Sequence, residues 1–294
     1  MSEVTKISWT RSTFNPWIGC TKIGPGCDHC YAEVQDRRKR WGGTTHWGVG
    51  VPRMRTSEQN WNKVMRWERL AVEEKRTGHI TPGHEWARPG FWPVFCASLA
   101  DVFDNEVPQV WRDDLFYLIS QTPNLSWLLV TKRIGNVARM VPESWLHNYF
   151  PSNARLLITV VNQEEADRDI PKLLALPCKN GISYEPALGP VDWWQIPVPG
   201  THGDMCDMRD FGWIIVGGES KQSGHEARLF DLAWARSTIE QCKVAGVPIF
   251  VKQLGSFPVE TFAKWGDHFP SLIDRAGTDL TEWTEDLRVR EFPS

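Results

Sequence analysis

Short apolar runs and amphipathic stretches alternate along the chain past residue 90. Six of the apolar runs have the length of buried strands, and they cover residues 93–98, 127–131, 155–161, 181–185, 213–217 and 248–252. Helical patterns lie between several of them, and strands joined through helices pair in parallel by right-handed crossovers. The pattern therefore predicts an α/β fold, either a β/α barrel or a doubly wound sheet.

Two of the intervening helices can be predicted in detail. Asn105 is placed to cap the first, with Pro108 in its first turn, and its apolar face consists of Val107, Val110, Trp111, Leu115 and Leu118. Asp231 caps the second and Gly246 ends it, and its apolar face consists of Leu232, Ala235, Ile239 and Cys242.

Polar residues follow the apolar runs at their carboxyl ends. They are Ser98, Asp101, Thr131, Lys132, Asn162, Gln163, Glu185, the turn Gly217-Gly218-Glu219-Ser220, Lys252 and Gln253. Each one alone also fits an ordinary loop or capping residue. Together they favour a barrel, in which the strand ends converge on one mouth around a ligand. We expect one barrel over residues 1–255, with insertions at 42–90 and 186–210, and a peripheral extension at 256–294.

Three cysteines fall within one short segment, at Cys20, Cys27 and Cys30. The residues Gly24–Gly26 allow the segment to curl, and a helical pattern follows at 31–41, so the segment ends at a helix N-terminus that favours an anionic group. A structural zinc site normally has four protein ligands, whereas a 4Fe-4S cluster held by three cysteines keeps one iron free to bind a small molecule. The missing fourth ligand therefore predicts a reactive 4Fe-4S cluster.

Two other interpretations of these cysteines remain open. His29 can complete a zinc site, although it lies between two ligands in a tight turn. A disulfide framework fits less well, because the seven cysteines are odd in number and the N-terminus lacks the apolar core of a signal peptide. We expect a cytoplasmic protein whose other cysteines behave as small apolar residues: Cys96, Cys178, Cys206 and Cys242.

Charge is unevenly distributed along the 294 residues, although the formal net charge is only −3. Residues 1–90 carry 15 Lys and Arg against 9 Asp and Glu, and the remainder carries 18 against 27. This basic segment includes Arg37–Arg40, Arg53 and Arg55, and eight of the 17 tryptophans lie within the first 92 residues. Such runs form either solvated helix faces or phosphate-binding surfaces, and interleaved aromatics suit nucleic acid. DNA or a nucleotide is thus a candidate partner, and no membrane span is expected.

Several sequence segments resemble one branch of a known superfamily. They are Ile7–Thr10, Phe14–Cys20, the Cys27-x-x-Cys30-Tyr-Ala-Glu33 continuation, Leu129–Arg133, Ser183–Pro190, Val216–Ser220 and Phe250–Gly255. In this order they resemble the phage-associated, three-cysteine branch of the radical S-adenosylmethionine (radical SAM) superfamily. The chain departs from the superfamily in its first cysteine spacing, where six residues stand in place of the usual three.

The resemblance implies a partial (β/α)6-type TIM barrel and two cofactors, a 4Fe-4S cluster on Cys20, Cys27 and Cys30 and S-adenosylmethionine on the open iron. An electron from a donor such as flavodoxin or ferredoxin would cleave S-adenosylmethionine to a 5′-deoxyadenosyl radical, which removes a hydrogen atom from the substrate. By position in the motifs, His29 would lie beside the adenine. Candidates for the other cofactor contacts are Ser98, Asp101, Lys132, Asn162, Glu185, Gly217, Gly218 and Glu219.

A partial resemblance to spore photoproduct lyase suggests the substrate class. Cys96-Ala-Ser98 is similar to a segment of that enzyme, and strand alternation places Cys96 on the face of Ser98. Cys96 would then return a hydrogen atom to the product radical, with Tyr184 as a relay, although alternation points Tyr184 away from Glu185. The ordinary alternative for Cys96 is a buried strand thiol.

Three functions follow from these observations. The first is a radical SAM enzyme that repairs or modifies DNA, a nucleobase or another nucleic acid, in a lyase-like reaction. The second is a radical SAM enzyme for a small metabolite or a peptide. The third is a zinc-stabilised nucleic-acid-binding module without catalysis.

Overall fold

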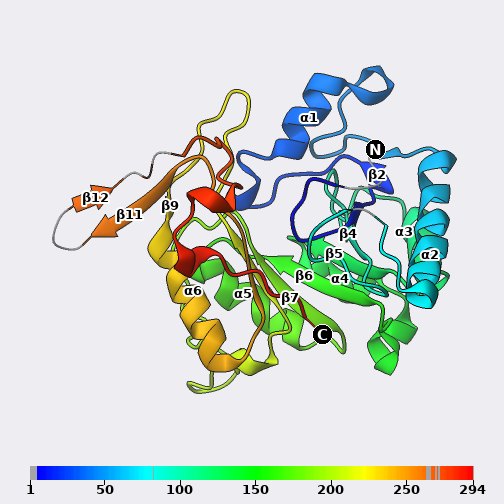
Figure 1. The fold of residues 1–294 in the computed structure, drawn as a ribbon. Coiled ribbons are helices and arrows are strands. Elements are labelled where there is room, and N and C mark those ends of the chain that lie inside the picture. The colour runs from blue at the N-terminus through cyan, green and yellow to red at the C-terminus, as the bar shows by residue number, and fades with distance from the viewer. Residues whose placement is uncertain (1–4, 82, 263–265, 269, 271, 294) are drawn as a thin grey trace. The chain divides into compact units, whose positions relative to one another are not determined.

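A seven-stranded sheet forms the centre of the fold in the computed structural model, which describes residues 5–81, 83–262, 266–268, 270 and 272–293 (Figure 1). Along the sheet the strands are β1 (Ser12–Thr13), β4 (Pro93–Cys96), β5 (Ser126–Thr131), β6 (Ala154–Thr159), β7 (Lys179–Tyr184), β8 (Ile214–Gly217) and β10 (Ile249–Gln253). β4 pairs in parallel with β1 and β5, and β8 with β7 and β10. The strands follow chain order without the reversal of a doubly wound sheet, as in a partial α/β barrel. The predicted α/β class is confirmed.

The six apolar runs are six of these strands. Their side chains are buried almost without alternation, as in β4 and β8, because helices and loops cover both faces of a parallel sheet. The first strand, β1, was not predicted, since it has only two residues, Ser12 and Thr13, and neither is apolar.

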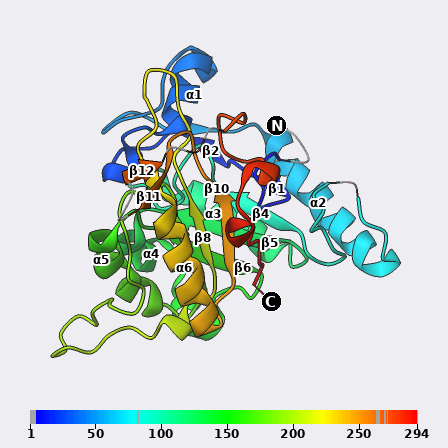
Figure 2. The same cartoon turned by 60° about the vertical axis from the view of Figure 1, so that its left-hand side comes forward.

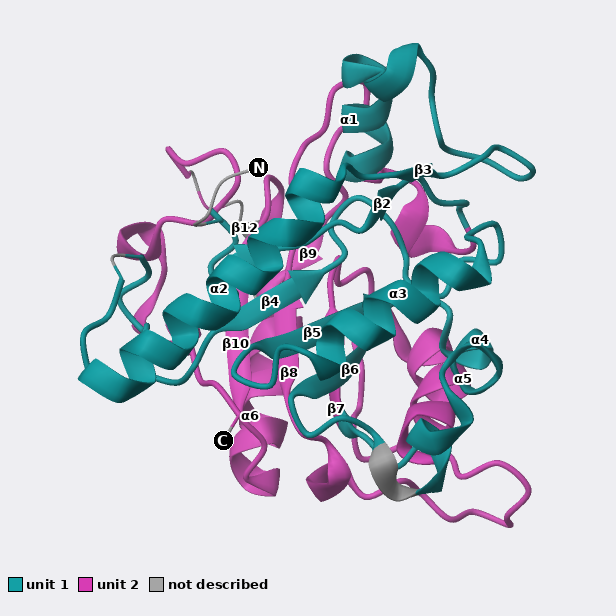
Figure 3. Cartoon of the chain, turned by 90° about the vertical axis from the view of Figure 1, so that its right-hand side faces the viewer, with its two compact units in different colours: residues 1–22, 31–157, 176–179 teal, residues 23–30, 158–175, 180–294 magenta. Residues whose placement is uncertain are grey.

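The chain folds as two compact units, which are coloured separately in Figure 3. The first unit consists of residues 1–22, 31–157 and 176–179, and the second of residues 23–30, 158–175 and 180–294.

The first unit contains β1, β4, β5 and most of β6, with α2 and α3 on one side of β4 and β5 (Figures 1 and 3). An antiparallel pair, β2 with β3, precedes α2. The remaining elements are β2 (Trp17–Ile18), α1 (Tyr31–Lys39), a 3-10 turn at Trp41–Gly43, β3 (Met54–Arg55), α2 (Glu58–Thr77), α3 (Gln109–Ser120), α4 (Ile134–Met140) and a π-helical turn at Trp145–Tyr149.

The helix predicted after residue 105 begins later than expected. Pro108 is the N-cap of α3, and Asn105 lies outside the helix, where its Oδ1 accepts hydrogen bonds from Asn136 and Arg139. The predicted apolar face was wrong at Val110, which is 59% exposed, because the phase of the helix differs. The buried face instead consists of Arg112, Leu115, Phe116 and Ile119.

The second unit contains β8, β10 and α6, which packs against β8, β9, β10 and β11 (Figures 1 and 2). Asp231 caps α6 by accepting a hydrogen bond from the Ala233 amide, and Gly246 ends it with a φ of 71°, so both predicted helix ends are confirmed. The other elements are α5 (Gln163–Leu174), β9 (Phe230–Asp231), α6 (Leu232–Ala245), β11 (Pro258–Phe262), β12 (Gly266–His268), and 3-10 turns at Pro25–Cys27, Met208–Asp210, Leu280–Glu282 and Glu285–Leu287.

The C-terminal segment, expected to be a peripheral extension, continues alongside β10. The amide of Val251 donates to Val289 O at 2.9 Å, and the amide of Glu291 donates to Ile249 O at 2.8 Å. Trp283 and Leu287 are buried. Among the described residues, no helix is both long and apolar enough to cross a membrane.

Candidate functional site at the cysteine segment and the strand ends

The three cysteines of the segment occupy different local structures. Cys20 follows β2, Cys27 ends the 3-10 turn at Pro25–Cys27, and Cys30 immediately precedes α1. Cys27 is buried, the other two are half-buried, and none of the three forms a disulfide. Cys20 belongs to the first unit, whereas Cys27 and Cys30 belong to the second.

The donor set fits a thiolate-bound metal or an iron-sulfur cluster. Free thiols are the soft ligands that such groups prefer, and residues 20–30 supply three of them. Within the described residues, no three His, Cys, Asp or Glu side chains are already arranged around a metal position. The predicted cluster ligands therefore rest on their spacing and their chemistry.

Gly19 fixes the backbone directly before Cys20. Its φ is +113°, a region that favours glycine, and a Cβ atom here would overlap His46 O and lie 2.8 Å from Cδ of Arg53. No other residue type fits this position without movement of the residue 46–53 loop.

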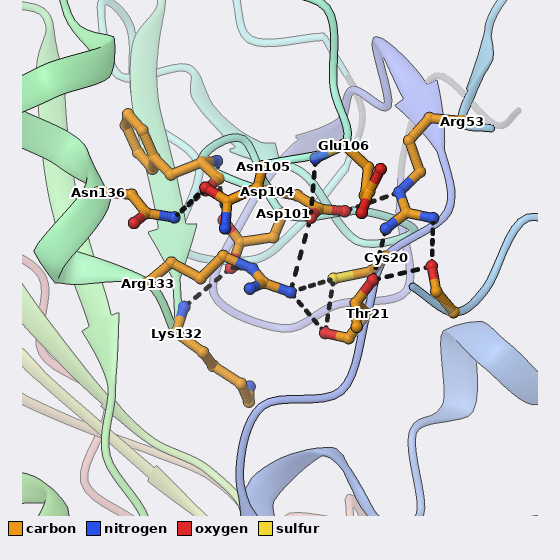
Figure 4. A network of polar contacts seen from close by, with 12 residues as sticks. Cys20, Thr21, Arg53, Asp101, Asp104, Asn105, Glu106, Lys132, Arg133 and Asn136 are labelled. Carbon is orange, nitrogen blue, oxygen red and sulfur yellow. Dashed lines mark hydrogen bonds and ion pairs between the residues drawn. The ribbon is translucent and has the colours of Figure 1, made fainter. Parts of the chain in front are cut away.

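Cys20 lies against a buried arginine (Figure 4). Nη2 of Arg133 donates to Cys20 Sγ at 3.8 Å and to Thr21 O at 2.5 Å. Burial and, after it, the charges of Asp101 and Asp104 raise the pKa of the Cys20 thiol to about 12, against the opposing effect of Arg133.

Two buried carboxylates organise the loop that follows β4. Asp101 accepts hydrogen bonds from the Phe103 amide, the Thr131 hydroxyl and the Lys132 amide at 2.8–3.0 Å. Its carboxylate thus joins the end of β4 to the end of β5. Lys132, a predicted cofactor contact, reaches Asp101 with its backbone and not with its ammonium group.

The second carboxylate belongs to Asp104. It accepts from Nε of Arg53 at 2.7 Å, and Nη2 of the same arginine donates to the Thr21 hydroxyl at 2.6 Å. Arg53 is fully buried, so this ion pair fixes Thr21, the neighbour of Cys20, without solvent contact. Asp104 and Arg133 were not predicted as site residues.

In the second unit, Glu219 connects the end of β8 to the cysteine segment. Its carboxylate accepts from Nε and Nη2 of Arg228 at 3.0 and 2.6 Å, from the Arg228 amide at 2.9 Å, and interacts with Nδ1 of His29 at 2.9 Å. Nη1 of Arg228 also donates to Pro25 O at 2.8 Å. Residues 25–29 are therefore held by a carboxylate and a guanidinium from the same loop after β8.

These donors also lower the pKa of Glu219. Burial raises the pKa of Glu219, but the hydrogen bonds from Arg228 and His29 outweigh it and hold that pKa below its usual value. An ionised carboxylate only accepts, so Nδ1 of His29 carries the proton and Nε2 is left as the second ring nitrogen. The ring of His29 stacks on His225, with centroids 4.7 Å apart.

The predicted glycine turn after β8 has a steric cause. A Cβ atom on Gly218 would overlap Leu254 O and lie 2.9 Å from Cδ1 of Phe230, and one on Gly217 would lie 3.4 Å from Gln253. The turn and the end of β10 thus pack backbone to backbone, which only glycine at 218 permits.

Two more predicted contacts lie at other strand ends of the second unit. Glu185 follows β7 and forms an ion pair with Lys252 of β10, both side chains being about one-fifth exposed. Asn162 follows β6 and caps α5 by accepting from the Glu165 amide at 3.0 Å. The Glu185 carboxylate is therefore partly accessible to a ligand, whereas the Asn162 side-chain oxygen is used in capping the helix.

Ser98 and Cys96 do not share one regular strand. β4 ends at Cys96, so alternation does not extend to Ser98, whose hydroxyl accepts from Nδ2 of Asn15 at 3.0 Å and whose carbonyl accepts from the Tyr31 hydroxyl at 2.7 Å. Cys96 is fully buried, and burial raises the pKa of its thiol.

Tyr184, the predicted relay, lies in the core of the second unit. It is fully buried, its hydroxyl donates to Gly189 O, and its ring packs edge-on against Trp193 at 5.4 Å. Burial raises the pKa of its phenol.

A family model described as "Protein of unknown function (DUF5131)" matches residues 4–282. The chain belongs to the DUF5131 family. The match includes the cysteine segment and every strand of the seven-stranded sheet, so both are parts of the family's domain. Neither the curated proteins nor the solved structures contain a match to this chain.

Proposed function

We propose that this DUF5131 protein is a radical SAM enzyme whose 4Fe-4S cluster is held by Cys20, Cys27 and Cys30. The observation that carries the proposal is the donor set, three cysteines within residues 20–30 that form no disulfide. The parallel strand order and the polar residues at the strand ends support it, because such sheets bind ligands at the carboxyl ends of their strands.

The reduced cluster, when bound, would supply one electron that cleaves S-adenosylmethionine to methionine and a 5′-deoxyadenosyl radical. The chain's own residues would orient the reactants and exclude water. Glu219 and Arg228 fix residues 25–29, and Arg133 fixes Cys20 and Thr21. Glu185 and Lys252 are the polar strand-end pair that keeps partial exposure, and we propose them for contact with S-adenosylmethionine. A flavodoxin or ferredoxin would supply the electron.

For the substrate we propose DNA or a nucleobase, in a lyase-like repair or modification reaction. Support comes from the end of α1, where Arg37, Arg38, Lys39 and Arg40 are all exposed and begin seven residues after Cys30. Consecutive exposed cations suit phosphate contacts. If duplex DNA binds there, its affinity should fall steeply with salt. Salt-independent binding of a small metabolite or a peptide would favour the second substrate class.

We expect the reconstituted protein, reduced with dithionite, to form 5′-deoxyadenosine and methionine slowly from S-adenosylmethionine even without substrate. Chromatography of the quenched reaction measures both products, and unreduced protein is the control. A cluster-replete, reduced sample that forms neither product contradicts the proposed activity.

One observation favours a zinc-stabilised nucleic-acid-binding module as a second candidate. The Nδ1 of His29 interacts with Glu219, and a carboxylate in that position commonly orients a histidine that binds zinc through its other nitrogen. Anaerobic reconstitution separates the two candidates. An iron-sulfur protein will be brown, with broad visible absorption and acid-labile sulfide, whereas native zinc leaves the protein colourless.

Replacement of Cys96 by Ala tests its proposed role as hydrogen-atom donor. We expect Cys96→Ala to keep its cluster and to form 5′-deoxyadenosine, while product shifts to unquenched or trapped species. The cavity left by the fully buried thiol should lower the free energy of unfolding by about 1 kcal/mol. Mass spectrometry of the products measures the shift. Normal product at wild-type yield would leave Cys96 only a packing role.

A further inference from the structure

The guanidinium of Arg133 contacts Cys20 although its side chain is buried beside the carboxylates of Asp101 and Asp104 (Figure 4). The side chain is only 8% exposed. Its Nη2 donates to both Cys20 Sγ and Thr21 O, at 3.8 and 2.5 Å. A buried arginine ordinarily satisfies its donors on carboxylates in a short, bidentate geometry.

The carboxylates beside Arg133 are more distant than that geometry requires. Nε of Arg133 lies 4.0 Å from Asp101 Oδ2, and Nη2 lies 3.7 Å from Asp104 Oδ1. Nε is buried and has no hydrogen-bond partner among the described residues. The arginine therefore makes its short contacts with the Cys20–Thr21 segment, and the carboxylates act on it through charge.

The carboxylates are themselves held in place by other donors. Thr131 and Lys132 bind Asp101, and Arg53 binds Asp104. The charges of Arg53 and Arg133 thus lie beside those of Asp104 and Asp101. Because other donors bind both carboxylates, the Arg133 guanidinium can keep its hydrogen bond to Cys20 Sγ and does not move toward either carboxylate.

We propose that Arg133 is a positioning residue for Cys20, whose N–H···S hydrogen bond fixes this ligand and raises the reduction potential of the cluster. This inference rests on the proposed function. A hydrogen bond donated to a ligand sulfur stabilises the more negative, reduced cluster more than the oxidised one, and a charged donor strengthens the effect. Arg133 thereby makes the cluster easier to reduce.

The test is a redox titration of reconstituted Arg133→Met and Arg133→Lys proteins, followed by electron paramagnetic resonance and visible absorption. At a fixed ambient potential we expect Arg133→Met to lower the ratio of reduced to oxidised cluster by about tenfold, the effect of one charge-assisted hydrogen bond. Arg133→Lys keeps the positive charge but lacks the planar guanidinium group, so the ratio of reduced to oxidised cluster should fall by less in this variant.

Arg112→Met is the matched control. Arg112 is a buried arginine of the same unit that donates to Asp104 O and Gln109, without contact to the cysteine segment. Its loss should lower stability and leave the potential unchanged. Thermal unfolding of all three variants measures the loss of stability separately.

Each outcome decides a different point. The role of Arg133 would be overturned if wild type and both Arg133 variants had the same reduction potential. It would also be overturned if Arg112→Met shifted the reduction potential as much as Arg133→Met does. If Arg133→Met fails to fold, Arg133→Lys decides, and a wild-type potential in that variant rejects the inference. Iron and sulfide analysis of the wild type comes first, because their absence contradicts the proposed function itself and ends this inference with it.

Discussion

Replacing Cys27 with Ala is expected to abolish cluster assembly, and Cys20→Ala and Cys30→Ala should do the same. Three thiolates are the fewest that hold a 4Fe-4S cluster with one open iron, so removal of one leaves a two-thiolate site. Cys27 is the most informative position, because it is buried at the end of a 3-10 turn and Cys30 is the only cysteine near enough in sequence to replace it. Iron, sulfide and visible absorption after anaerobic reconstitution measure the loss.

The other cysteines supply the matched controls. Cys178→Ala, Cys206→Ala and Cys242→Ala should keep wild-type iron and sulfide, because these thiols lie outside the segment. Cys242 is fully buried in α6, so its replacement should lower the free energy of unfolding by about 1 kcal/mol without loss of iron. A fully loaded cluster in Cys27→Ala, or a missing one in Cys242→Ala, contradicts the ligand assignment.

The sheet could be predicted from the sequence because its strands are buried on both faces. Runs such as 155–161 are mainly apolar, with five apolar residues beside Arg155 and Thr159 and no strict polar alternation, and the structure places a strand in each run. The strand β1 could not be found in this way. It is a strand because it pairs with β4, and its own composition gives no sign of this.

Helix ends were predicted well where one side chain determines them. Asp231 and Gly246 mark the two ends of α6 through a cap and a left-handed residue, both of which are local effects. For α3, both Asn105 and Pro108 were possible positions for the N-cap. Asn105 binds Asn136 and Arg139 instead, so the helix begins after Pro108. The phase of the buried face followed that start and was wrong at Val110.

The candidate site was predictable residue by residue, but its connections were not. Asp101 and Glu219 were identified from their positions after strands, yet several of their partners are distant in sequence: Thr131 and Lys132 for Asp101, and His29 for Glu219. Arg133 belongs to the segment Leu129–Arg133, in which only Lys132 was a predicted cofactor contact, and no sequence signal connected Arg228 to residues 25–29. Such pairings depend on which loops the fold brings together.

Glu219 provides a second large expected effect, because one carboxylate binds two partners. In Glu219→Gln the Arg228 guanidinium and the His29 ring lose their anion, while the side chain keeps its size. Glu219 is only 8% exposed and Arg228 is 26% exposed, so we expect the free energy of unfolding to fall by about 2–3 kcal/mol at neutral pH. Denaturant unfolding followed by tryptophan fluorescence measures this loss.

The pH dependence of this loss identifies the carboxylate as its cause. Because the pKa of Glu219 is lower in the folded protein than in the unfolded chain, its contribution is complete above the unfolded value of about 4.3 and is lost as the pH falls through the folded value. The difference between wild type and Glu219→Gln should therefore be constant near neutral pH and shrink on acidification. Glu226→Gln is the control in the same loop, since Glu226 is 81% exposed and should contribute less than about 0.5 kcal/mol at any pH. If wild type and Glu219→Gln are equally stable at neutral pH, Glu219 does not hold residues 25–29 in place.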